Sequence, residues 1–166
     1  MNKSNLLFLF DYTQWANHRL LDTAARLPTE KFADPHRTTY GSLRGILVHI
    51  LVSYQVWLGR CRDGRMPPVF PIDEEFPDVA AFNRRFSALE AELRAYLESL
   101  SEDDMQRLVT HTTSRGEVFT NRLWQIFTHL FNHATQHRSE AAEVMTEYGE
   151  SPGNLDLIWY LREIEG

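Results

Sequence analysis

Residues 121–148 read NRLWQIFTHLFNHATQHRSEAAEVMTEY, and this stretch decides the fold. Its apolar residues recur at steps of three and four, which is the spacing of a helix face that packs on a core. They are Leu123, Phe127, Leu130, Ala134, Ala141 and Met145. Gly149 suits the position after a helix, because glycine adopts the left-handed backbone conformation at little cost. The pattern therefore predicts one long helix that begins near Asn121 and ends at Gly149.

Three histidines in this stretch, His129, His133 and His137, follow one another at intervals of four residues. Side chains at positions i and i+4 lie one above the other on a helix. We expect His133 and His137 to point inward, where an imidazole finds few hydrogen-bond acceptors. Two such histidines can bind one metal ion from a single helix. The spacing also fits exposed or hydrogen-bonded histidines, so a third histidine elsewhere is needed to favour a metal site.

His49 is the third candidate. It lies in residues 42–60, which we predict to form a helix with Ser42 as its N-cap, since a serine hydroxyl accepts an unpaired N–H of the first turn. Residues 46–52 are apolar on nearly all sides apart from His49, and a helix that is apolar all round is usually buried. A buried imidazole needs a partner, which is either a neighbouring carbonyl or hydroxyl group or a metal ion.

Two further long helices are predicted, over residues 3–27 and residues 78–100. The first ends before Pro28, because the residue before a proline is pushed out of the helical region. The second has Asp78 as its N-cap and an apolar stripe at near-heptad spacing. Four long amphipathic helices without a long strand predict an all-α fold, a four-helix bundle, in one domain over residues 1–166. The connections are longer than tight turns, so the order of the helices in the bundle stays open.

Shorter elements are predicted between and after these helices. We expect one helical turn at residues 29–32, a loop at residues 61–77, and a capping box at residues 101–104 that opens a short helix. A small two-stranded hairpin is predicted around residues 114–116, with His111 exposed. A short terminal helix is expected to dock on the bundle through Leu155, Ile158, Trp159 and Leu161.

The net charge of −6 argues against general nucleic-acid binding, which needs a basic surface. Cys61 is the single cysteine, so no intrachain disulfide forms, which fits a reducing cytoplasm. The apolar run at residues 6–10 is too short for a signal sequence, and no stretch approaches the ~20 apolar residues of a membrane helix. We therefore expect a cytoplasmic protein with no nucleic-acid partner and no membrane partner.

In a four-helix bundle, inward side chains of facing helices can meet at one point. His49 can then join two histidines of the long helix around one ion, and three neutral nitrogen ligands suit zinc, nickel, copper or iron. Three protein ligands leave a position open for water or substrate, which is typical of a catalytic site. The three histidines of the long helix span ~12 Å, which is too far for one ion. His129 is therefore an alternative to His133 or His137, and the residues alone leave this choice open.

Four segments of the chain carry a family resemblance: DYTQWANHRLLDTAARLP (residues 11–28), YGSLRGILVHILVSYQVWLGR (40–60), HLFNHATQHRSEAAEVM (129–145) and GESPGNLDLIWYL (149–161). In order and spacing, and over nearly the whole chain, they resemble the DinB-like (damage-inducible, YfiT/DinB-type) family of metalloenzymes. The resemblance implies a four-helix bundle, a homodimer, and a divalent metal, zinc or nickel, bound by His49, His133 and His137. Family members often read HHRGQ where this chain has QHRSE, so His137 and Arg138 are kept and the flanking residues are not.

The resemblance also implies a function. Better understood members of the family are S-transferases and isomerases that use a low-molecular-weight thiol such as bacillithiol or mycothiol. We therefore expect a metal-dependent enzyme that activates a thiol or water for attack on a small electrophilic substrate. The alternatives are a metal-dependent hydrolase without a thiol and a non-catalytic metal-binding stress-response protein. No nucleophile or general base in the sequence separates these three hypotheses.

Several other side chains are candidates for supporting roles. Arg138 and Arg60 are the candidates for binding an anionic substrate. Glu140 is a candidate charged partner for Arg138 or for an imidazole of the site, although a surface position on the helix is the simpler interpretation. Four residues are expected either to line the cavity or to pack around it, namely Tyr12, Trp15, Asn17 and Trp57.

Overall fold

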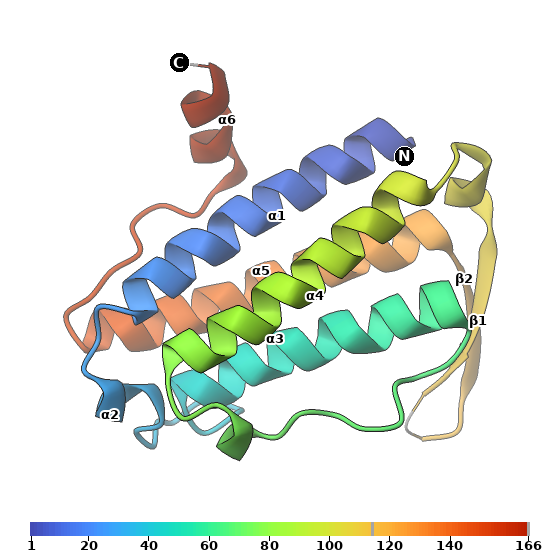
Figure 1. Ribbon diagram of the computed structural model, residues 1–166. Coiled ribbons are helices and arrows are strands. Elements are labelled where there is room, and N and C mark those ends of the chain that lie inside the picture. Colours follow the sequence, from blue (N-terminus) through green and yellow to red (C-terminus); the bar gives the residue numbers. More distant parts are fainter. Residues whose placement is uncertain (114, 166) are drawn as a thin grey trace.

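Four long helices form the body of the protein in the computed structural model, which describes residues 1–113 and 115–165 (Figure 1). They are α1 (Lys3–Ala24), α3 (Leu43–Leu58), α4 (Val79–Ser99) and α5 (Leu123–Glu147). Two short antiparallel strands, β1 (Leu108–Thr112) and β2 (Val118–Arg122), lie at one end of the bundle. The prediction of an all-α four-helix bundle with a small hairpin is therefore confirmed.

The order of the helices follows from which pairs are in contact. α5 packs against α1 and α3, and α4 packs against the same two helices. The order around the bundle is therefore α1, α4, α3, α5. α3 and α4 run in one direction, and α1 and α5 run in the other (Figure 1). Because α3 and α4 are parallel, the chain returns along the bundle through residues 64–78 before α4 begins, which explains the long loop between them.

The predicted N-caps are confirmed, and they explain where two of the helices begin. The Ser42 hydroxyl accepts a hydrogen bond from the Gly45 N–H at 3.0 Å, and the Asp78 carboxylate accepts one from the Ala81 N–H at 2.7 Å. Each bond pairs a backbone donor that has no partner within its helix. A Cβ atom at Gly45 would lie 2.1 Å from the Tyr40 carbonyl oxygen, so this glycine lets the segment before α3 pack against its first turn.

The predicted end of α1 is wrong, because the helix stops at Ala24 instead of Leu27. The N–H groups of Arg26 and Leu27 bond to the carbonyls of Thr23 and Ala24, which lie only three residues back. This tighter turn places the Leu27 side chain in the core, where it is 8% exposed. The spacing of apolar residues thus continues through Leu27 although the α-helix does not.

The boundaries of α5 are close to those predicted. It begins at Leu123 and not near Asn121, because Asn121 pairs with Val109 in the hairpin. Gly149 follows the helix with a φ of 88°, and its N–H bonds to a carbonyl of the last turn, as expected of a C-terminal glycine. Ser114, which we expect in the turn of the hairpin, lies outside the described residues.

The shorter elements complete the chain. They are α2 (Thr29–Phe32), the π-helical turn η1 (Gly59–Asp63), the 3-10 turns η2 (Asp73–Glu75) and η3 (Asp103–Gln106), and α6 (Leu157–Glu165). The capping box before η3 is confirmed, since the side chains of Ser101 and Asp104 each accept a hydrogen bond from the backbone N–H of the other.

α6 lies above α1, outside the four-helix bundle but in contact with α1 (Figure 1). The prediction that Ile158 and Trp159 dock this helix on the bundle is wrong, because these side chains are 52% and 40% exposed. Tyr160 packs instead against the rings of Phe8 and Tyr12, with ring centroids 5.9 and 6.0 Å apart. The terminal helix therefore docks through the side that carries Tyr160, while Ile158 and Trp159 remain in contact with solvent.

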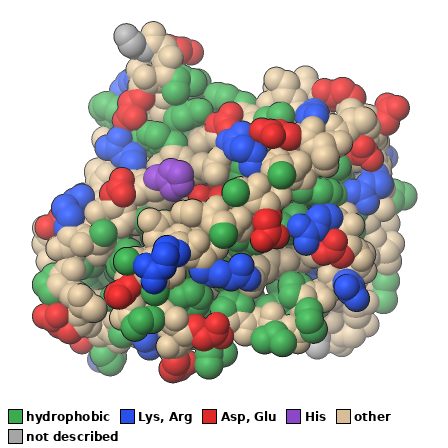
Figure 2. Space-filling model, viewed as in Figure 1, with side chains coloured by type: hydrophobic (Ala, Val, Ile, Leu, Met, Phe, Trp, Pro, Cys, Tyr) green, Lys and Arg blue, Asp and Glu red, His purple; other side chains and the backbone are tan. Residues whose placement is uncertain are grey.

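Charged side chains of both signs are spread over the surface. Figure 2 shows acidic and basic residues interspersed on one face, without a large area of a single sign. This distribution agrees with the modest net charge of −6. Within residues 1–113 and 115–165, none of the helices combines the length and the apolar character that crossing a membrane requires.

Candidate metal centre

Three imidazoles meet where α3 and α5 face each other. His49 comes from α3, and His133 and His137 come from successive turns of α5. One ring nitrogen from each residue takes part, and these three atoms all lie within 4.8 Å of one another. Nε2 of His49 is 3.0 Å from Nε2 of His133. Among the described residues, these are the only three His, Cys, Asp or Glu side chains that come together in this way.

The meeting point follows from the arrangement of the helices. α3 and α5 are antiparallel neighbours, so His49 in the middle of α3 faces the middle of α5. His133 and His137 share one face of α5 because they are four residues apart. His129 lies one turn earlier and packs on Trp57, with ring centroids 5.6 Å apart. The structure thus brings His49, His133 and His137 together and leaves His129 beside the group.

The two facing imidazoles are neutral near neutral pH. Burial, with a smaller contribution from the nearby His137, lowers the pKa of His49 to about 4. Burial and the neighbouring histidines lower the pKa of His133 to about 4 as well. A neutral imidazole keeps the free lone pair that a metal needs. Zinc–nitrogen bonds of about 2.1 Å in a tetrahedron place ligand nitrogens ~3.4 Å apart. The 3.0 Å between His49 and His133 is close to that value, and the three nitrogens lie within 4.8 Å of one another, so the three donors could hold one ion.

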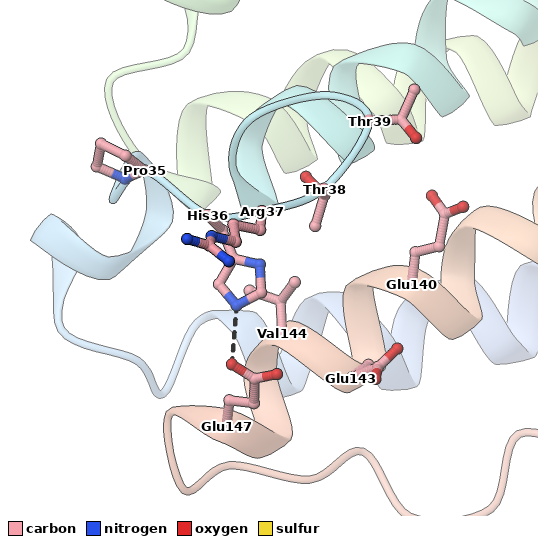
Figure 3. A pocket seen from close by; sticks show the side chains of 9 residues that line it. All are labelled: Pro35, His36, Arg37, Thr38, Thr39, Glu140, Glu143, Val144 and Glu147. Atoms are coloured by element: carbon pink, nitrogen blue, oxygen red, sulfur yellow. Dashed lines mark hydrogen bonds and ion pairs between the residues drawn. The ribbon is translucent and has the colours of Figure 1, made fainter.

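Glu140 fixes the orientation of His137. Its carboxylate accepts a hydrogen bond from Nδ1 of His137 at 2.8 Å. With the proton on Nδ1, Nε2 keeps its lone pair, which is the usual role of a carboxylate behind a metal-binding histidine. Of the two roles considered for Glu140, the structure shows the one at the imidazole. Glu140 also lines a surface pocket of about 560 Å³ between the loop before α3 and the C-terminal half of α5 (Figure 3).

Two side chains that were not predicted also contact the imidazoles. The Tyr40 ring stacks on His49 with centroids 4.1 Å apart and meets His137 edge-on at 5.3 Å. Ser53 Oγ lies 3.1 Å from Nε2 of His133. Ser53 follows His49 by four residues, so helical spacing alone could have placed it on the same face. Tyr40 lies in the loop before α3 and carries no such signal in the sequence.

Arg138 does not face the imidazoles. It follows His137 directly, so it points about 100° away around α5. Its side chain is 1% exposed and donates to Asn17 Oδ1 at 3.1 Å and to Thr135 Oγ1 at 2.7 Å. Asn17 in turn donates to the buried Glu90 carboxylate at 2.8 Å. Arg138 and Asn17 therefore belong to a polar network in the interior of the bundle.

The aromatic candidates divide into two groups. Tyr12 and Trp15 pack against Tyr160 of α6, with ring centroids 6.0 and 5.7 Å apart, and so help to hold the terminal helix. Trp57 instead is linked to the three imidazoles through His129, because its ring contacts His129, which in turn contacts His133. Of the predicted cavity residues, Trp57 is thus the one that reaches the candidate metal centre, through His129.

Replacing Glu140 by alanine is expected to weaken metal binding about tenfold or more, because loss of a carboxylate behind a metal-binding histidine frees its ring to turn. Competition with a chelator measures the affinity. Glu143→Ala is the matched control, since Glu143 lines the same pocket and is exposed on the next turn of α5. An equal loss of affinity in both variants would assign the effect to general negative charge and not to the contact with His137.

The comparison with known proteins agrees with this geometry. The model of a family described as "DinB family" matches residues 1–165. "Protein DinB" of Bacillus subtilis (strain 168) is 21% identical over 159 residues, which cover 92% of this chain and 91% of the relative. The match extends over all of the helices that build the bundle and over all three imidazoles. The chain therefore belongs to the DinB family.

Proposed function

We propose that this chain is a metal-dependent enzyme of the S-transferase type, with a zinc or nickel ion held by His49, His133 and His137. The ion would activate a low-molecular-weight thiol, or water, for attack on a small electrophile. The observation that carries this proposal is the convergence of three imidazoles from two helices, with His49 and His133 only half-buried. Solvent therefore reaches one side of the group, and three protein ligands leave a position for a small molecule.

A divalent metal supplies Lewis-acid chemistry in such a site, since it lowers the pKa of a thiol or water and polarises an electrophile. The residues of the chain shape the space around it. The Tyr40 ring covers one face of His49, which restricts approach to the side where His133 lies. The Ser53 hydroxyl next to Nε2 of His133 is placed to hydrogen-bond a molecule bound at the open position.

Cobalt-substituted protein tests the proposal, because the visible absorption of cobalt(II) reports its ligands. Addition of β-mercaptoethanol is expected to produce a sulfur-to-cobalt band in the wild type and none in His133→Ala. Turnover of ester or amide substrates that requires the metal but no thiol would identify a hydrolase instead. A cobalt spectrum that thiols leave unchanged, without such turnover, would indicate a closed and non-catalytic metal site and would overturn the proposal.

A further inference from the structure

The row of side chains between α3 and α5 continues beyond the three imidazoles. Trp57 on α3 packs edge-on against His129 of α5, and the His129 ring is 5.6 Å from that of His133. Trp57 also meets His111 of β1, with centroids 5.0 Å apart. The prediction that His111 is exposed is wrong, because it shares a strand face with the buried Val109 and is half-buried. The row therefore leads from the candidate metal ligands to the hairpin.

Arg60 lies at the far end of this row. Its guanidinium carbon is 4.7 Å from the centre of the Trp57 ring, and Nη2 donates to the Thr112 carbonyl at 2.8 Å. Its Nε is buried and has no hydrogen-bond partner among the described residues. The nearby Arg62 is paired with two carboxylates, whereas Arg60 has no carboxylate partner in the described part of the chain. These contacts therefore fix the position of the Arg60 guanidinium, while its positive charge is not paired with a carboxylate.

The His111 imidazole beside Arg60 adds polar atoms without a fixed charge. Burial and the nearby charge of Arg60 both lower the pKa of His111. Its ring is therefore mostly neutral near neutral pH. Nδ1 of His111 is buried without a partner among residues 1–113 and 115–165. This end of the row thus combines one permanent positive charge, an aromatic ring and an unpaired hydrogen-bonding atom.

We propose that Arg60, together with Trp57 and His111, binds a carboxylate at the far end of the small molecule whose reactive group lies at the three imidazoles. A single guanidinium matches the single charge of a carboxylate, and Nη1 of Arg60 can donate a charge-assisted hydrogen bond to it while Nη2 stays on the Thr112 carbonyl. Arg138, the other candidate for an anion, is 1% exposed and committed to Asn17 and Thr135. This inference rests on the proposed function, which places the reactive group at the imidazoles.

The separation between the two ends determines the shape of the ligand. Ser53, which lies beside His133, and Arg60 are seven residues apart in the sequence. At about 1.5 Å per residue this corresponds to ~10 Å along a helix. Helical side chains point back toward the N-terminus, so Arg60 reaches part of the way toward the imidazoles. The ligand is therefore extended, with its carboxylate several bonds away from its reactive group.

Two thiols of equal chain length test the proposal. Mercaptohexanoate ends in a carboxylate, and mercaptohexanol ends in a hydroxyl. Zinc-loaded protein is titrated with each thiol by isothermal calorimetry. The wild type is expected to bind mercaptohexanoate about tenfold more tightly, the factor that one charge-assisted hydrogen bond supplies. Arg60→Met is expected to lose this preference, while its zinc content and its affinity for mercaptohexanol stay those of the wild type.

Arg62→Met is the matched control. Arg62 lies in the same η1 turn and is engaged with Asp63 and Glu92, so its replacement is expected to keep the tenfold preference of about 1.4 kcal/mol. If both thiols bind the wild type equally well, the carboxylate site is overturned. An unchanged preference in Arg60→Met overturns it as well.

A second measurement separates this inference from the proposed function. Hexanoate carries the carboxylate without a thiol, and it is titrated into metal-free protein while NMR follows the indole N–H of Trp57. A shift is expected in the wild type and in Arg62→Met, and none in Arg60→Met. If neither thiol binds the zinc-loaded protein and hexanoate still shifts Trp57, the thiol function fails and the carboxylate site stands. If neither thiol binds and Trp57 does not shift, both fail.

Discussion

Alanine in place of His133 is expected to lower the metal content of the purified protein from about one ion per chain to nearly none. His133 is the middle residue of the group. Its Nε2 is 3.0 Å from that of His49, and its ring centroid is 4.4 Å from that of His137. Without it, two imidazoles from different helices remain, which is too few for a three-ligand site. The measurement is elemental analysis of protein purified without an affinity tag, since histidine tags bind metal themselves.

His129→Ala is the matched control for this experiment. His129 lies on the same face of α5, one turn before His133, and outside the group of converging nitrogen atoms. We expect this variant to keep its metal. The pair of variants therefore also decides between the two ligand sets that helical spacing leaves open. Equal metal content in the wild type and in His133→Ala would remove the metal site, and the proposed function with it.

Methionine in place of Arg138 is expected to lower the free energy of unfolding by about 3 kcal/mol, the cost typical of removing one charged member of a buried, hydrogen-bonded network. Arg138 and Glu90 are each 1% exposed, and Asn17 bridges them through hydrogen bonds of 3.1 and 2.8 Å. Methionine fills part of the volume but removes the positive charge that Asn17 links to the Glu90 carboxylate, which then keeps only the contact with the exposed His18 imidazole at 3.1 Å and the hydrogen bond from Asn17. Urea unfolding of both proteins measures the difference.

Arg84→Met is the control for this effect, because Arg84 is exposed on α4 and its replacement is expected to change stability by no more than about 0.5 kcal/mol. The double variant Arg138→Met/Glu90→Gln is expected to recover part of the loss, since no uncompensated charge then remains. A loss in Arg138→Met no larger than that in Arg84→Met would show that the network does not stabilise the bundle.

The long helices could be predicted because the spacing of apolar residues and the N-caps are local properties. Ser42 and Asp78 begin their helices where each side chain accepts a backbone N–H bond. The order of the helices could not be predicted, because long connections allow several arrangements and contacts between distant segments select one. The residues through which α6 docks were predicted wrongly for a related reason. The rotation of a short helix depends on its neighbours, and Tyr160 rather than Ile158 meets α1.

The site could be predicted only in part. The interval of four residues places His133 and His137 on one face, but the position of α3 along α5 determines which histidines His49 meets. The contact of Tyr40 with His49 depends on the loop before α3, whose packing no local pattern in the sequence reveals. For Arg138 the sequence suggested a contact with the site that the structure does not contain. Its place beside His137 in the sequence suggested a role at the site, while the turn of the helix carries it into the interior.

His49 and His133 are 84 positions apart in the chain, so an ion shared by them would act as a removable cross-link between two distant segments. Anything that binds the folded chain and not the unfolded chain shifts the folding equilibrium, and the shift grows with the logarithm of its free concentration. If the chain binds an ion as proposed, metal supply and heat resistance are coupled. Chelation would remove the cross-link while α3 and α5 stay packed on each other, and the thermal melting curve would shift to lower temperature.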